Sequence, residues 1–302
     1  MKMTLKKGLA IGSLAIATAA LLAVTDYTNK HRVIEFSMNS NEAMSSDFEM
    51  LEKDFAAQEE AQSIALAISG IERISLTSYA DIQEARALYD HASAEAKGYI
   101  NEADLLEAEA TYEKLENERQ EKLLEAERCD DLEGILDYAP CSVQGSGNEY
   151  LDELVQSYID KATTPDMSRS EKLTACYDYM VANYDYDSNY NYDYSCGRHS
   201  VAWAVSFLRD GYGTCNQWSS AFMYVSKALG YDAELYYGAT ASSRGGSTEH
   251  YWPVIHVNGT SYIFDPQVER DMTRKSGINS HRRFGLYGES ADAKYYFSNI
   301  VD

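Results

Sequence analysis

One cysteine, one histidine and one aspartate in the last third of the chain have the types and the order of a nucleophile, a base and an orienting carboxylate. Cys215 follows Gly213 and precedes a stretch of helical character that ends at Gly230. A thiol at a helix N-terminus faces the positive end of the dipole and free backbone N–H groups, which favour the thiolate and can stabilise an oxyanion. A lone cysteine is more often a small buried residue, so the prediction depends on its partners.

The two partners lie on a predicted β-hairpin. Asn258-Gly259 separates two runs rich in β-forming residues, which is a hairpin signal. His250 is then near the start of one strand and Asp265 at the end of its antiparallel neighbour, so both lie at the same end of the sheet. Asp265 can bind one ring nitrogen of His250 and hold the other toward Cys215. The sequence therefore predicts a Cys215–His250–Asp265 triad.

His256 is a rival to His250, because it lies on the same side of the strand, but it is closer to the turn and is expected to be structural or surface-facing. The side chain that completes an oxyanion hole stays open among four candidates: Trp203, Tyr212, Gln217 and Trp218. We also expect three aromatic side chains to contact the substrate: Trp252, Tyr212 and Trp218.

The order of these motifs resembles the transglutaminase-like superfamily of papain-like cysteine enzymes. The resemblance covers about residues 149–268 and rests on the following segments: Tyr177-Asp178-Tyr179, Tyr184-Asp185-Tyr186, Gly213-Thr214-Cys215, Ala221-Phe222, Leu229-Gly230-Tyr231, His250-Tyr251-Trp252, Asn258-Gly259 and Phe264-Asp265-Pro266. It implies an α+β domain over residues 149–302, helical in its first half and with an antiparallel sheet in its second. It also implies that Cys215 is the nucleophile, His250 the general base and acid, and Asp265 the orienting carboxylate.

Two helices are predicted to open this domain, over residues 149–160 and 170–184, because apolar side chains recur there every three or four residues. The following Tyr-, Asn- and Asp-rich stretch, residues 185–194, is too polar for a core strand and is interpreted as an exposed loop. Its tyrosines are candidates for lining a substrate groove.

Four cysteines remain besides Cys215, an even number that permits two disulfides outside the cell. Local closure favours Cys129–Cys141 and Cys176–Cys196, while reduced structural cysteines are the alternative. No Cys-x-x-Cys or His-x-x-x-His spacing indicates a metal site, and no cofactor is expected.

Residues 42–128 are predicted to be an acidic helical spacer. They contain no Pro and much Ala, Glu, Leu and Gln, and their apolar residues form three amphipathic stripes that can pack as a small bundle. The stretch resembles the three-helix spacer repeats of bacterial surface proteins. Its charges are expected to be a solvated face.

Residues 1–25 have the pattern of a targeting segment, since Lys2, Lys6 and Lys7 precede an uncharged apolar run from Gly8 to Thr25. A cleaved signal and an uncleaved membrane anchor both stay open, and either places the rest of the chain outside the cytoplasm. Residues 26–41 and 129–148 are predicted linkers.

The net charge of −22 argues against nucleic-acid binding, because phosphate contacts need Lys and Arg. The sequence thus predicts a surface-located, cysteine-dependent acyl transfer on protein or peptide amides, either hydrolysis or Gln–Lys transamidation. Cell-wall or surface proteins are the expected partners. The alternatives are a catalytically inactive module that binds proteins or the cell wall, and a coiled-coil assembly protein that carries the C-terminal domain as a passenger.

Overall fold

The computed structural model describes residues 41–71, 73–188, 199–241 and 245–302, and it is an α+β protein, as predicted. The predicted targeting segment, residues 1–25, and most of the linker after it lie outside the described residues. None of the helices in the described ranges has both the length and the apolar run that a bilayer crossing requires. The described residues divide into two compact units: residues 41–64 with His91–Ile100 form one, and the described parts of Ala65–Asp90 and Asn101–Asp302 form the other.

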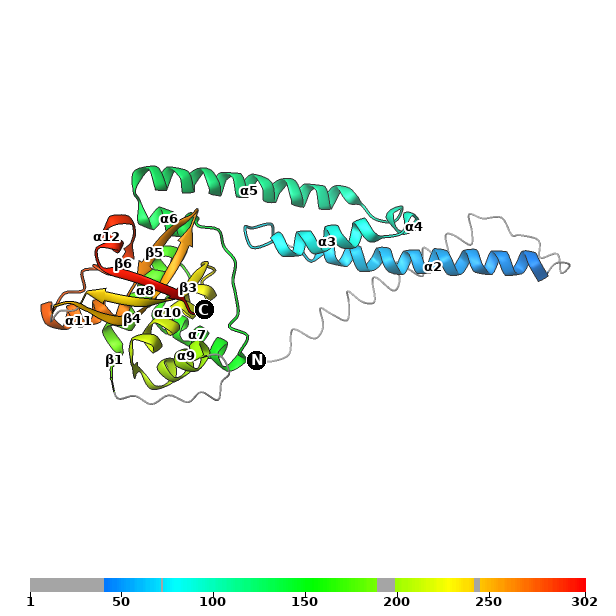
Figure 1. The fold of residues 1–302 in the computed structure, drawn as a ribbon. Coiled ribbons are helices and arrows are strands. Elements are labelled where there is room, and N and C mark those ends of the chain that lie inside the picture. Colours follow the sequence, from blue (N-terminus) through cyan, green and yellow to red (C-terminus); the bar gives the residue numbers. More distant parts are fainter. Residues whose placement is uncertain (1–40, 72, 189–198, 242–244) are drawn as a thin grey trace, which may run out of the picture. The chain divides into compact units, whose positions relative to one another are not determined.

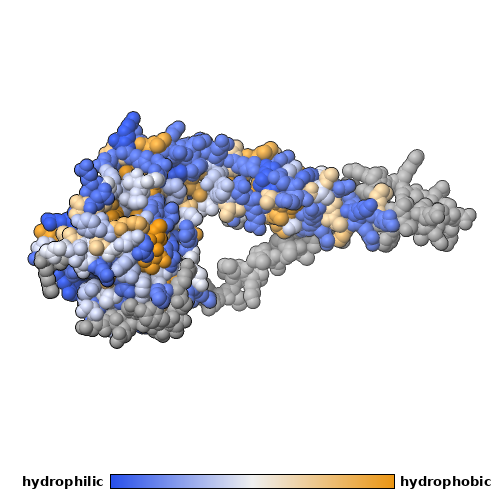
Figure 2. Space-filling model, viewed as in Figure 1, coloured by the Kyte–Doolittle hydropathy of each residue, from blue (hydrophilic) through white to orange (hydrophobic). Residues whose placement is uncertain are grey.

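The predicted spacer is helical along most of its length. Its helices are α2 (Asn41–Ser69), α3 (Tyr79–His91), α4 (Ala94–Lys97) and α5 (Glu102–Cys129). In the second unit Arg86 joins α3 to α5, because its guanidinium makes bonds of 2.7 and 2.8 Å to the two carboxylate oxygens of Glu109. Figure 2 shows a largely hydrophilic surface over α5, as expected for a helix with a solvated face.

The predicted linker over residues 129–148 contains a helix instead. Helix α6 (Leu132–Tyr138) buries Ile135 and Leu136 in the core of the C-terminal domain, together with side chains from the end of α5. Gly134 permits this packing, since a Cβ there would lie 2.9 Å from the Cβ of Ala126. A seven-residue helix with a buried face is too short to give a clear periodic signal, which is why the sequence pattern missed it.

Four more helices precede the sheet, and the two predicted ones are in place. They are α7 (Glu149–Ala162), α8 (Arg169–Asn183), α9 (His199–Asp210) and α10 (Cys215–Ala228). Part of the predicted exposed loop forms a short strand, because β1 (Asp185–Tyr186) pairs in parallel with β2 (Tyr212–Gly213). Residues 189–194 of that loop lie outside the described residues.

The sheet has five strands in the order β6-β5-β4-β3-β7, and all its pairs are antiparallel (Figure 1). Its strands are β3 (Ala233–Ala241), β4 (Ser247–Val257), β5 (Thr260–Phe264), β6 (Phe284–Leu286) and β7 (Tyr295–Ile300), with α11 (Pro266–Ser276) after β5 and α12 (Gly288–Asp292) before β7. The predicted hairpin joins β4 to β5 through Asn258-Gly259, both of which have positive φ. The last strand, β7, lies at the opposite edge of the sheet from β6 and pairs with β3, which is far from it in the sequence.

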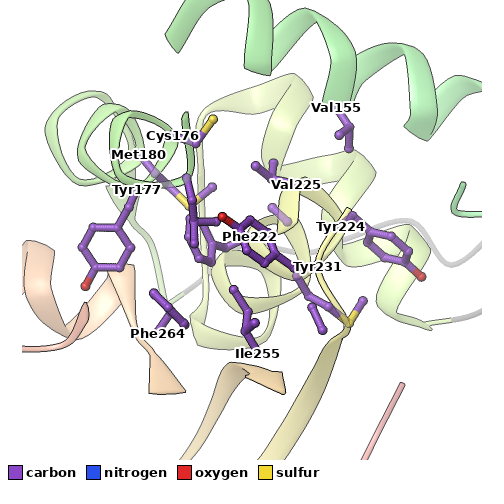
Figure 3. Close-up of a cluster of buried hydrophobic side chains, with 14 of the residues drawn as sticks. Val155, Cys176, Tyr177, Met180, Phe222, Tyr224, Val225, Tyr231, Ile255 and Phe264 are labelled. Carbon is purple, nitrogen blue, oxygen red and sulfur yellow. The ribbon is translucent and has the colours of Figure 1, made fainter. Parts of the chain in front are cut away.

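The main core lies between α10 and the sheet. Phe222 of α10 is fully buried and packs edge-on against Tyr177 of α8, with ring centroids 5.5 Å apart (Figure 3). Its ring is tilted against that of Phe264 of β5, with centroids 6.0 Å apart. Ile255 of β4 contributes from the sheet side. Full burial of such side chains contributes roughly 1.5–3 kcal/mol each. The N-terminus of α10 is thereby fixed against β4, which positions the site.

The predicted disulfides are not formed among the described residues, where Cys129, Cys141, Cys176 and Cys215 are free thiols. The Cys129–Cys141 prediction is wrong because α6 lies between the two residues and spans about 10 Å at 1.5 Å per residue, more than a disulfide bridges. Cys176 is buried in the core as a small apolar side chain, and its predicted partner Cys196 lies outside the described residues.

Candidate active site

Cys215 is the first residue of α10, and a capping box fixes it there. The Oε1 atom of Gln217 accepts a hydrogen bond of 2.9 Å from the backbone N–H of Thr214, while its Nε2 donates to Ser206 at 2.8 Å. Gly213 leaves the space for this side chain, since a Cβ at that position would lie 2.7 Å from Gln217 Oε1. The free N–H groups of the first turn of α10 are thus presented beside a half-buried thiol.

The segment before Cys215 is held from α11. Strand β1 pairs with β2, so Tyr186 lies opposite Gly213. Arg270 donates from Nε to the carbonyl of Tyr184 at 2.6 Å, and the guanidinium groups of Arg270 and Arg274 both bind the carboxylate of Asp185. These contacts connect β1, and through it the segment before Cys215, to α11.

His250 and Asp265 are brought together by the hairpin, at the same end of the sheet. Nε2 of His250 lies 2.8 Å from Oδ2 of Asp265, and the two residues are 3% and 0% exposed. Asp265 is also the N-cap of α11, because its Oδ1 accepts from the N–H of Val268 at 3.0 Å. Since Nε2 faces Asp265, the nitrogen left for the hydrogen bond with Cys215 is Nδ1.

The charges of this site support one another. Burial by itself lowers the pKa of His250, but the Asp265 carboxylate and the hydrogen bond with Cys215 outweigh burial and raise that pKa to about 10. Burial by itself raises the pKa of Asp265, but the charge and hydrogen bond of His250 outweigh it and the net shift is downward. The arrangement therefore favours an imidazolium between two acids, which is the state that pairs with a thiolate.

Sequence reasoning missed Tyr295, a fourth member of this cluster. Its hydroxyl donates to Asp265 Oδ2 at 2.7 Å, and its ring packs on Trp252 with centroids 5.0 Å apart. Tyr177 donates to the backbone carbonyl of Asp265 at 3.1 Å. Tyr295 belongs to β7, and no local pattern around it signals a site, because only the crossing of β7 to the far side of β3 brings it to Asp265.

A cavity of about 600 Å³ opens beside Cys215 and His250, within the usual range for ligand pockets. Its other lining residues come from β1, the β3–β4 hairpin, α11 and the segment before β6, and those used below are Tyr186, Glu249, Asp271, Lys275 and Arg283. A second cavity of similar volume, about 590 Å³, lies between α6 and α8 and does not include Cys215.

The predicted substrate contacts do not line this cavity. Trp218 of α10 and Trp252 of β4 are 0% and 1% exposed, because each lies on a face of its element that packs into the core. Tyr212 is 41% exposed but does not line the cavity. Gln217 is committed to its cap. Trp203 packs edge-on against Tyr251.

His256 lies six residues along β4 from His250 and hydrogen-bonds Glu234 at 3.0 Å and Ser261 at 3.0 Å, so its ring nitrogens have structural partners of their own. Within the part of the chain that the structure describes, no group of three His, Cys, Asp or Glu side chains is arranged to hold a metal ion.

Residues 154–266 match the family model of the transglutaminase-like superfamily, and this segment forms a transglutaminase-like domain. One similar solved structure is a "putative cysteine protease" from Cytophaga hutchinsonii, 15% identical, with a TM-score of 0.32 and 52% of each chain covered. Another is a TGase, 17% identical, with a TM-score of 0.28 and coverage of 40% of this chain and 31% of the other. The chain thus spans about half the length of the first and a third of the second. At these scores neither likeness bears on reaction or substrate, and no curated protein matches the sequence.

Proposed function

We propose that the C-terminal domain catalyses acyl transfer from protein or peptide amides, with Cys215 as nucleophile, His250 as general acid and base, and Asp265 as orienting carboxylate. The observation that carries this proposal is the pairing of the buried His250. One of its ring nitrogens lies 2.8 Å from Asp265, and the other hydrogen-bonds Cys215. Both His250 and Cys215 line a cavity of about 600 Å³. A nucleophile, a base and an orienting acid in reach of an open cavity are what such chemistry requires.

In the first step the Cys215 thiolate attacks the amide carbonyl, and a C–S bond forms while the carbonyl oxygen gains the negative charge. Backbone N–H groups at the start of α10 stabilise that oxyanion. The His250 imidazolium then gives its proton to the departing nitrogen, the C–N bond breaks, and a thioester remains on Cys215.

The second step uses the same histidine as a base. Acylation removes the charge and hydrogen bond of Cys215, which are among the causes that raise the pKa of His250. The pKa of His250 therefore falls, and the imidazole, which has given up its proton, stays neutral and available as a base. Water or a lysine amine loses a proton to His250 and attacks the thioester carbonyl, and the C–S bond breaks as the Cys215 thiolate leaves. Water yields a carboxylic acid, whereas a lysine amine yields an isopeptide. We favour hydrolysis, because a cavity open to solvent admits water.

The proposed setting is the cell surface, where the segment of residues 1–25 would direct or anchor the chain and the acidic helices would hold the domain away from the membrane. Wall or surface proteins are then the substrates within reach. The basic n-region and apolar run of the sequence support this part of the proposal.

The test is alkylation of the full chain with iodoacetamide from pH 4 to 9, with each cysteine quantified by peptide mass mapping. Cys129 is an exposed thiol of the same molecule and serves as the internal control. We expect Cys215 to react faster than Cys129 at pH 6, and His250→Ala to abolish this advantage, since the imidazolium that stabilises the thiolate is removed.

Cys215→Ala must remove the fast-reacting site and leave Cys129 unchanged. Reaction of Cys215 at or below the rate of Cys129 at pH 6, unaffected by His250→Ala, would contradict the proposal and favour a non-catalytic binding module.

A further inference from the structure

Arg283 lines the same cavity as Cys215 and His250, and its position is fixed by its backbone. Its N–H donates to Oε2 of Glu269 at 2.7 Å, and its carbonyl accepts from the N–H of Asp265 at 2.8 Å. Glu269 is fully buried. The residue that carries this guanidinium is therefore anchored directly opposite the acid that orients His250.

The guanidinium itself has few partners in the part of the chain that the structure describes. Among residues 41–71, 73–188, 199–241 and 245–302, Nε of Arg283 is buried without an acceptor, Nη1 donates only to the carbonyl of Arg282 at 3.4 Å, and no carboxylate forms an ion pair with the guanidinium. The group lies 5.8 Å from the ring centroid of Tyr295. An arginine stays charged and offers five donors in a planar fork, so this one has donors to spare beside the cavity.

The acids around the cavity are, in contrast, already supplied with donors. Asp271 accepts from Nε2 of Gln267 at 2.8 Å and has Lys275 one turn along α11. Glu249 hydrogen-bonds the hydroxyl of Tyr237. The unmet requirement of this cavity is thus an acceptor for Arg283, and a planar carboxylate is the acceptor whose geometry fits an arginine fork.

We infer that Arg283 binds a carboxylate of the substrate, so that the domain acts on amides that carry an acidic group close to the reacting carbonyl. Lys275, exposed at the rim, adds to the attraction without a fixed geometry. The carboxylate belongs either to an acidic side chain or to a free chain end, which present the same group. The inference rests on the proposed function for the acyl transfer at Cys215, whereas the binding of a carboxylate by Arg283 does not depend on that reaction.

The experiment uses chloroacetyl reagents, which alkylate a thiol by forming a C–S bond as chloride leaves. Three are compared on the full chain: chloroacetyl-glutamine amide, which is neutral, chloroacetyl-glutamate amide, with an acidic side chain, and chloroacetyl-glutamine, with a free α-carboxylate. The second-order rate constant is measured at Cys215 and at Cys129.

We expect one or both acidic reagents to alkylate Cys215 about 10- to 100-fold faster than the neutral one, as charge-assisted hydrogen bonds allow, with no such preference at Cys129. The reagent that shows the larger preference identifies the source of the carboxylate. Arg283→Gln should remove the preference and leave the rate with the neutral reagent within about threefold.

Arg282→Gln is the matched control, because it removes the same charge from an exposed neighbour outside the cavity. Arg283→Lys keeps the charge without the fork and should retain part of the preference. Equal rates for all three reagents in the unmodified protein, or a preference that survives Arg283→Gln, would overturn the inference. Failure of Cys215 to react with iodoacetamide would instead count against the proposed function, because iodoacetamide has no carboxylate and its reaction tests only the activation of the thiol.

Discussion

Tyr295 donates a hydrogen bond of 2.7 Å to Oδ2 of Asp265, the same oxygen that binds Nε2 of His250 at 2.8 Å. Burial raises the pKa of Tyr295 well above its ordinary value, so the hydroxyl stays protonated and remains a donor at neutral pH. One carboxylate oxygen is thus held between a phenol and an imidazole, which fixes the plane of the carboxylate and the direction of the histidine.

Tyr295→Phe removes only that donor. We expect the free energy of unfolding to fall by about 1–3 kcal/mol, the usual range for a lost hydrogen bond to a charged group. Alkylation of Cys215 at pH 6 should slow by about threefold to thirtyfold, since a loss of 0.7–2 kcal/mol in orientation corresponds to roughly that factor. Tyr296→Phe is the control, because Tyr296 is 56% exposed on the same strand. Equal effects of the two changes would show that the hydroxyl of Tyr295 has no special part.

The protonation of His250 can be followed by NMR of its ring nitrogens. In the unmodified protein we expect titration near pH 10. Cys215→Ala should lower the pKa of His250, because it removes the charge and hydrogen bond of the thiolate. Asp265→Asn should lower that pKa further, because burial then acts with little opposition. A titration near 6.5 in all three proteins would contradict the coupling of the three side chains.

The stability of the fold should depend on Asp265 with a definite sign. The pKa of Asp265 is lowered from 3.8, so its stabilising contribution is fully present above that pH and is lost as the pH falls through the lowered value. Asp265→Asn should cost about 3–5 kcal/mol near pH 7, because it removes one partner of the buried His250–Asp265 pair. Urea unfolding at descending pH should show the two proteins converging below about 3.8. A difference that grows in acid would reverse the sign and contradict the assignment.

Gly238→Ala tests whether β7 must lie close to β3. A Cβ at Gly238 would lie 2.0 Å from the backbone oxygen of Tyr296 and 2.8 Å from the ring of Trp252, so β7 has to move. We expect a loss of about 1–3 kcal/mol or more in unfolding free energy and slower alkylation of Cys215, since Tyr295 moves with the strand. At Gly70, the control, the nearest atom to an added Cβ is 3.3 Å away. Unchanged reactivity in Gly238→Ala would mean that Tyr295 keeps its place.

Gln217→Met tests whether Gln217 acts as the cap of α10 or as a hydrogen-bond donor to the oxyanion. Gln217 is fully buried and bonded to Thr214 and Ser206, so the change leaves buried polar groups unpaired and should cost about 1–3 kcal/mol in unfolding free energy. Alkylation of Cys215 should slow as the first turn of α10 loosens. Full stability combined with slow alkylation would point instead to a direct role of Gln217 in the chemistry.

Local signals in the sequence were sufficient for the residues that meet through short-range structure. The Asn-Gly turn set the β4–β5 register, and that register puts His250 and Asp265 at one end of the sheet. The glycine before Cys215 and the apolar stretch after it located the start of α10. These features depend on turn chemistry and helix capping, which neighbouring residues determine.

The rest depended on contacts between distant parts of the chain. Tyr295 and Arg283 follow irregular segments and reach the site only through the pairing of β7 with β3 and of β6 with β5. The aromatic character of Trp218 and Trp252 predicts substrate contact, but a residue type does not reveal which face of its element is buried. The Cys129–Cys141 prediction failed for a related reason, since closeness in sequence does not ensure closeness across an intervening helix.

The end of α5 buries Leu123 and Ala126 in the same core as Phe222 of α10. A protease that cut between α5 and α6 would therefore remove part of the hydrophobic core rather than sever a flexible tether. If the helices do connect the domain to a cell surface, tension along α5 would load that core directly, and the reactivity of Cys215 would respond to mechanical force.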